Sequence, residues 1–218
     1  MREVTETAGG ASSDPVERRR DWTVSDAEPS SMDTTDLFEM AEALYYGRGM
    51  PEDHAAAAEW YRSAALAGMP KGQAMLGLLY LEGDGVPQDD VQAAAWVRMA
   101  AEQGDVDGQI GLASLYECGR GVPQDDEQAA FWFLKAAQSG EPVAQHKIGI
   151  CCFNGRGVRQ SYIEAFFWFD LASLWHFADE TQQAVARDRA LAESHLPVSI
   201  QQGLNAQNKN SIGDGFGV

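Results

Sequence analysis

The sequence has few basic residues and no long apolar run, and both shortages exclude classes of protein. Lys and Arg number 16 against 33 Asp and Glu, so the formal net charge is −17 at pH 7. A field of that sign repels phosphate backbones and anionic lipid headgroups, which argues against nucleic acid and membrane surfaces as partners. No window supplies the run of about 18 apolar residues that a membrane-spanning helix needs.

Cysteine is also scarce, and metal-ligand spacings are lacking. Three cysteines are too few, and odd in number, for a disulfide-stapled scaffold, so we expect reduced thiols in a cytoplasm. The arginine run 18–20 is followed by acidic residues rather than the apolar segment of an export signal. The four histidines have no His-x-x-x-His or Cys-x-x-Cys partner, and we therefore expect no metal and no cofactor.

What the sequence does contain is a repeat of 36 residues. GQAMLGLLYLEGDGVPQDDVQAAAWVRMAAEQG, residues 72–104, aligns without a gap on GQIGLASLYECGRGVPQDDEQAAFWFLKAAQSG, residues 108–140. One step back brings residues 40–68 into the same frame, and one step forward brings in residues 148–173. With 44% hydrophobic residues the chain can bury a core. The repeat predicts an all-α solenoid, in which each unit buries its apolar face against its neighbours.

Each unit carries the signals for two helices joined by a glycine turn. A capping pair, as in Asp89 with Gln92, starts the second helix. Inside that helix a tryptophan precedes an alanine by four residues, which predicts a large ring beside a site of close backbone approach. These pairs are Trp60 with Ala64, Trp96 with Ala100, Trp132 with Ala136, and Trp168 with Ala172. The Gly-x-Gly strings lack the further glycine and Lys-Ser/Thr of a phosphate loop, so we interpret them as helix ends. They are Gly47/Gly49, Gly83/Gly85, Gly119/Gly121 and Gly155/Gly157.

The repeat sets the expected domain organisation. The fourth unit departs from the pattern, with Arg159 in place of proline and Cys152 in place of tyrosine, and we expect a capping helical segment after it. We predict a disordered acidic tail over 1–36, repeats over 37–68, 69–104, 105–140 and 141–176, a cap over 177–202, and a flexible tail over 203–218.

The string L-G-x-x-Y-x-x-G-x-G-V-P-x-D-x-x-x-A-x-x-W-x-x-x-A-A-x-x-G, read from Leu76 to Gly104, resembles the Sel-one-like repeat (SLR), a relative of the tetratricopeptide repeat. The first unit departs from it at Ala41 and Leu44. The resemblance implies a right-handed superhelix of antiparallel helix pairs, with the first helix of each pair lining a concave face. It also implies an adaptor or scaffold of the kind found in bacteria.

In that register, first-helix positions not used for packing point into the concave face. The predicted partner-binding residues are Phe38, Glu42, Tyr45, Tyr46, Leu78, Leu81, Glu82, Ile110, Ser114, Glu117, His146, Ile150, Phe153 and Asn154. Their mixture of apolar side chains and carboxylates suits an extended peptide or a helix with apolar and basic residues. Two alternatives remain open: some of these residues belong to the core, or the N-terminal tail with Trp22 occupies the face.

The expected function is non-catalytic binding of a protein or peptide partner, with a basic partner favoured. The main alternative is a regulatory or accessory subunit that positions a partner enzyme. An intrinsic hydrolase is a third possibility, for which the sequence offers no catalytic residues. The fold alone does not choose among them, because one scaffold serves many partners.

Overall fold

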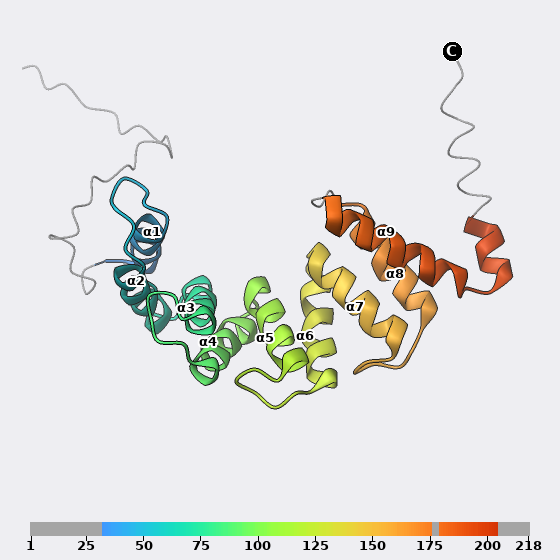
Figure 1. The fold of residues 1–218 in the computed structure, drawn as a ribbon, viewed down its shortest axis with the longest axis horizontal. Coiled ribbons are helices and arrows are strands. Elements are labelled where there is room, and N and C mark those ends of the chain that lie inside the picture. Colours follow the sequence, from blue (N-terminus) through green and yellow to red (C-terminus); the bar gives the residue numbers. More distant parts are fainter. Residues whose placement is uncertain (1–31, 176–178, 205–218) are drawn as a thin grey trace, which may run out of the picture. The chain divides into compact units, whose positions relative to one another are not determined.

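The computed structural model describes residues 32–175 and 179–204, and within these ranges the regular structure is helical, with no strand (Figure 1). The labelled helices are α1 (Thr34–Tyr45), α2 (His54–Leu66), α3 (Pro70–Glu82), α4 (Asp90–Glu102), α5 (Val106–Cys118), α6 (Asp126–Gln138), α7 (Pro142–Asn154), α8 (Tyr162–Ser173) and α9 (Asp179–Ser194). A further helical stretch covers residues 198–204.

The helices pack as a stack of pairs. The two helices of each unit contact each other, and each second helix contacts the first helix of the next unit, as α2 does with α3 and α4 with α5. α9 continues this order, because it packs on α8 and touches α7 as a further first helix would. The all-α solenoid predicted from the repeat is confirmed.

Small residues set the spacing between units. The alanines at 64, 100, 136 and 172 are fully buried. A Cβ added at Gly72 would lie 3.0 Å from the Cβ of Ala64, so α3 approaches α2 at that alanine. Trp60 and Trp132 are buried, whereas the tryptophans at 96 and 168 are half-buried. The close backbone approach expected at the alanines is therefore present, although the rings differ in burial.

The second glycine of the turn in the second, third and fourth units has a role that the sequence did not reveal. Gly121 has a φ of 66°, and a Cβ there would overlap the carbonyl oxygen of Asp90 in the preceding unit. The turn of one unit thus rests on the start of the previous unit's second helix. Gly49, in the first unit, has a φ of 80°, and a Cβ added there would have no other atom within 4 Å. Glycine at 121 therefore permits contact between units as well as the turn.

Helix ends follow most of the predicted signals. Asp89 accepts hydrogen bonds from the backbone N–H groups of Val91 and Gln92, both at 3.0 Å, so the predicted cap of α4 is present. α1 begins at Thr34, so residues 34–36, which the sequence assigned to the tail, are helical. α1 also closes on Tyr46, one residue before the expected glycine. The rest of that tail, residues 1–31, and residues 205–218 lie outside the described residues.

Candidate partner-binding face

The predicted partner-binding residues lie on or at the ends of the first helices α1, α3, α5 and α7, and none of them is buried. The exposed ones are Tyr46, Leu78, Glu82 and Asn154, and the others are half-buried. The side chains are thus accessible to some degree, although Leu81, Ile110, Ile150 and Phe153 also pack against the core. Their surroundings, however, differ along the solenoid.

An apolar cavity of about 440 Å³ lies over α3, and we call it the α3 hollow. It is lined by Phe38, Glu42, Lys71, Ala74, Met75, Leu78, Leu81, Val97, Asp107 and Gly111. Four of these residues were among the predicted set, and they come from α1 and α3. The hollow is within the volume range of small-ligand pockets and of grooves that accept side chains of a partner.

Two small residues create the α3 hollow. Ala74 occupies the repeat position that holds Phe38 in the first unit and Ile110 in the third. Gly111 occupies the position that holds Lys147 in the fourth unit. With no side chain at Gly111, the buried Val97 of α4 reaches the floor, where its Cγ1 lies 3.0 Å from the place of a Cβ. The hollow therefore depends on side-chain volumes at positions one repeat apart.

The rim of the α3 hollow carries two carboxylates and one amine. Glu42 and Asp107 supply the acidic groups and Lys71 the basic one. Glu42 Oε2 lies 3.5 Å from Arg48 Nη1, but the Arg48 side chain is 62% exposed. An ion pair that is this open to solvent contributes little and exchanges readily. Glu42 therefore remains available to a basic group of a partner.

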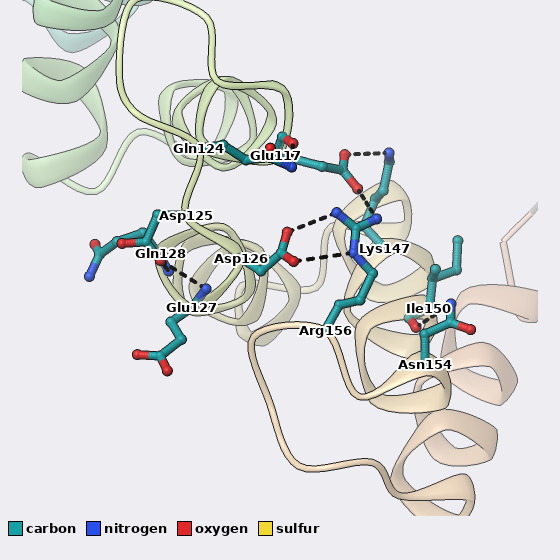
Figure 2. Close-up of polar contacts among 10 residues, drawn as sticks. All are labelled: Glu117, Gln124, Asp125, Asp126, Glu127, Gln128, Lys147, Ile150, Asn154 and Arg156. Atoms are coloured by element: carbon teal, nitrogen blue, oxygen red, sulfur yellow. Dashed lines mark hydrogen bonds and ion pairs between the residues drawn. The ribbon is translucent and has the colours of Figure 1, made fainter.

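An ion-pair network fills the face between α5 and α7 (Figure 2). Lys147 Nζ lies 3.1 Å from Glu117 Oε2, and Arg156 Nη1 lies 3.8 Å from Glu117 Oε1. Arg156 Nη2 also donates to Asp126 Oδ1 at 2.8 Å. Asp126 and Glu117 hold the pKa of the Arg156 guanidinium above its usual value. Glu117, predicted to be a partner-binding residue, thus forms ion pairs with two cations of the chain itself.

We call each contact between neighbouring units a joint. The joint between the second and third units uses Arg120, Asp90 and Leu81, which are equivalent to Arg156, Asp126 and Glu117. Arg120, in the turn after α5, donates to Asp90 Oδ1 at 2.6 Å and to the Leu81 carbonyl oxygen at 3.0 Å. The hydrogen bond from Arg120 holds the pKa of the Asp90 carboxyl below its usual value. Arg120 and Asp90 are 30 residues apart, as are Arg156 and Asp126. That recurring spacing is the signal in the sequence that would have indicated these pairs.

At the first joint, between the first and second units, the acidic residue stands in the turn instead of at the start of the second helix. Asp84 stands in the turn, and its Oδ1 lies 2.6 Å from Nδ1 of His54 at the start of α2. Tyr45 donates its hydroxyl to Asp84 Oδ2 at 3.0 Å, and its ring stacks on His54 with centroids 4.6 Å apart. Burial is the main reason that the pKa of Tyr45 is raised, and Asp84 adds to the effect. Tyr45, predicted to be a partner-binding residue, is therefore part of a joint between units.

α9 covers the predicted face at its C-terminal end. His146 Nε2 lies 2.9 Å from Asp188 Oδ2 of α9, and the ring of Phe153 meets that of His195 with centroids 5.5 Å apart. A smaller cavity of about 210 Å³ remains there, lined by Ile150, Phe153, Asn154, Phe169, Asp188 and Leu191. Residues of the fourth unit that were expected to meet a partner thus contact the chain's own cap.

The described residues present little reactive chemistry. Burial raises the pKa of the Cys151 thiol to about 11 and that of Cys152 to about 12, so both are protonated at neutral pH. Cys118 is exposed and free. Within residues 32–175 and 179–204, no group of three or more His, Cys, Asp and Glu side chains is arranged to hold a metal ion. In the same ranges no helix is both long and apolar enough to cross a membrane.

Comparison with known proteins agrees with this geometry. A family model described as Sel1 repeat matches residues 37–69, 70–105, 106–141 and 142–174, more than half of the chain, which confirms the resemblance to the SLR family. A Sel1 repeat protein from Oxalobacter formigenes is 30% identical with a TM-score of 0.63, over 74% of this chain and 63% of that one. No curated protein sequence matches.

A second solved structure is similar to the same degree. It is c5321, a protective antigen present in uropathogenic Escherichia coli strains that displays an SLR fold. It is 28% identical with a TM-score of 0.63, over 78% of this chain and 42% of that one. The chain thus spans less than half the length of c5321 and under two thirds of the Oxalobacter protein.

Proposed function

The chain belongs to the Sel1 repeat family, and from that premise we propose that it is a non-catalytic adaptor or scaffold that binds a segment of a partner protein in the α3 hollow. Proteins built from this repeat generally mediate protein–protein interactions. The observation that carries the proposal is the apolar cavity of about 440 Å³ on the first helices, with Phe38, Leu78 and Leu81 in its lining.

The lining suggests the chemistry of the partner segment. A cavity of this size accepts one or two bulky apolar side chains, such as neighbours on one face of a helix. Glu42 and Asp107 on the rim favour a lysine or arginine beside those apolar residues. The net charge of −17 would also speed the approach of a basic partner. The proposal includes a reducing cytoplasm of a bacterium, supported by the free state of the cysteines.

The ion-pair network at Glu117 limits which helices the partner segment can contact. Glu117 is held by Lys147 and Arg156, α9 contacts His146, and His195, just after α9, contacts Phe153. The partner segment would therefore lie over α1, α3 and the start of α5 rather than along every unit. Reversal of charge at Glu42 is expected to weaken binding more than reversal at Glu117, because the carboxylate of Glu117 already has two internal partners.

The proposal is tested by placing a large side chain in the α3 hollow, at a repeat position where the first unit already carries phenylalanine. Partners are captured on the full chain and identified, and the Kd of the best partner segment is then measured by calorimetry. Ala74→Phe, which copies Phe38, should weaken binding at least about tenfold by occupying the cavity. The matched control is Ala95→Phe, an exposed site on α4 where the next unit carries Phe131.

The two variants separate the outcomes. Retained affinity in Ala95→Phe with a loss in Ala74→Phe supports the hollow as the binding site. Equal affinities of wild type and Ala74→Phe would reject it. If the captured partner is an enzyme in one-to-one ratio, the chain acts as its accessory subunit through the same site.

A further inference from the structure

The second helix of the fourth unit, α8, has an apolar side that is exposed to solvent. Ile163, Phe167 and Leu174 are 56%, 53% and 71% exposed. They are spaced by four and seven residues and therefore lie on one side of the helix axis. Trp175, 53% exposed, follows directly after them. We call these four residues the α8 patch.

The other units show that the fold does not require apolar residues at these positions. The residues equivalent to 163, 167 and 174 are Glu127, Phe131 and Gln138 in α6, Val91, Ala95 and Glu102 in α4, and Ala55, Glu59 and Leu66 in α2. Each of those helices has at least one charged residue among the three. In α8 all three are large and apolar, so their exposure has no explanation in the packing of the repeat.

The cap does not cover the α8 patch. α9 packs against α8 through Arg189, which donates to Asp170 Oδ1 at 2.7 Å and lies over the ring of Phe166 at 4.9 Å. The buried residues Ala165, Phe169 and Ala172 supply the core side of α8. These contacts leave the side with Ile163 and Phe167 open to solvent.

We propose that the α8 patch is the interface with a second copy of this chain, in which the two α8 helices pair antiparallel about a two-fold axis near Phe167. The contact is independent of the α3 hollow, because it uses a second helix rather than the first helices. An isologous contact of this kind needs a surface that complements itself. The α8 patch meets that need because its four residues carry no charge, whereas two chains of charge −17 repel each other elsewhere.

A departure from the repeat pattern adds complementarity at the ends of the pair. Arg159 replaces the proline of the second and third units, is exposed, and forms no ion pair within the described part of the chain. Arg159 and Trp175 are equally far in sequence from Phe167. Arg159 lies in the connector before α8 and Trp175 lies just after α8, so an antiparallel pair centred on Phe167 brings Arg159 of one copy to the same end of the pair as Trp175 of the other. The pair has two such ends. A guanidinium over an indole ring is the most favourable cation–π arrangement in proteins.

The area of the patch suits a dimer contact. The exposed parts of its two aromatic and two aliphatic side chains amount to on the order of 400 Å². A standard interface buries about 800 Å² on each partner, of which the centre is apolar and the rim polar. The patch can supply such a centre, and the flanking polar residues of α8 can supply part of the rim.

The test measures mass against concentration for the full chain, by sedimentation equilibrium. The main variant carries Ile163→Glu, Phe167→Ala and Leu174→Gln, which are the residues found at these positions in α6, α4 and α6. Wild type is expected to dimerise with a micromolar Kd, and the variant to dimerise about 100-fold more weakly or worse. The matched control is Leu66→Gln, which removes an equally exposed leucine at the same repeat position of α2 and should leave the Kd unchanged.

Further variants test the register and the fold. Arg159→Ala should weaken the dimer about two- to fivefold, and Arg159→Lys should weaken it less, because lysine keeps the cation. If circular dichroism shows that the triple variant has lost helix, Leu174→Gln alone, outside the span of α8, takes its place. A wild type that is monomeric at about 100 µM, or a dimer that the patch variants do not weaken, would overturn the proposal. Ala74→Phe should leave the dimerisation Kd unchanged, so that failure of the dimer proposal can be told apart from failure of the binding proposal for the α3 hollow.

Discussion

The contact made by the second glycine of a turn gives the sharpest test of how the units are joined. Gly121→Ala places a methyl group where the carbonyl oxygen of Asp90 lies, in a residue with a φ of 66°. Gly49→Ala meets the same left-handed backbone, with a φ of 80°, but open space. The left-handed conformation alone costs an alanine about 1–2 kcal/mol. Both variants bear this cost, and only Gly121→Ala must also push two units apart.

The added cost at residue 121 can be bounded from the contacts that would move. Separation of the turn from α4 stretches the hydrogen bonds from Arg120 to Asp90 and to the Leu81 carbonyl. Forcing extra carbon atoms into a packed contact costs about 1–3 kcal/mol. Gly121→Ala is therefore expected to lose about 2–5 kcal/mol of unfolding free energy, and Gly49→Ala about 1–2 kcal/mol.

The assay is urea unfolding followed by far-UV circular dichroism and by tryptophan fluorescence. If circular dichroism and fluorescence give different unfolding curves for Gly121→Ala, the joint has weakened enough for parts of the solenoid to unfold separately. Equal losses for the two glycine variants would refute the reasoning, since the close approach to Asp90 would then cost nothing.

Two further predictions concern titration and thiol reactivity. The pKa of Asp90 is lower in the folded chain than its ordinary value near 3.9, so the bond with Arg120 stabilises the fold above that pH and is lost as the pH falls through the folded pKa. Unfolding midpoints in urea from pH 6 to about pH 2 should thus fall less steeply in Asp90→Asn, and parallel curves would contradict this. Because burial raises the pKa values of Cys151 and Cys152 to about 11 and about 12, a thiol reagent at pH 8 should label Cys118 alone in the native chain and all three cysteines in denaturant. Rapid native labelling of all three would show that the core around α7 opens.

The α3 hollow and the α8 patch lie on different helices, and neither contact requires the residues of the other. A dimer formed through α8 would present two hollows. A partner that carries two binding segments could then occupy both hollows at once. Its affinity would exceed that of a single segment by a factor that depends on the distance between the two hollows. Binding that depends on Ala74 and also on Phe167 is the expected signature of such a partner.

The sequence by itself determined the repeat, the two helices of each unit and most of their ends. These features depend on residues within a few positions of one another. Asp89 caps α4 through bonds to residues two and three positions on, and the buried Ala100 lies one helical turn from Trp96. Local signals of this kind can be read from one unit and checked against the next three.

Only the tertiary structure decided what the first-helix residues face. The joints link residues 30 to 39 positions apart, as Arg120 does with Asp90 and Leu81, and stacking of the units alone brings them together. The α3 hollow exists because Ala74 and Gly111 are small at positions where other units are large, and no single position carries that information. The repeat predicts the same surroundings for every unit, whereas the ion pair at Glu117 and the contacts of α9 depend on which units are neighbours.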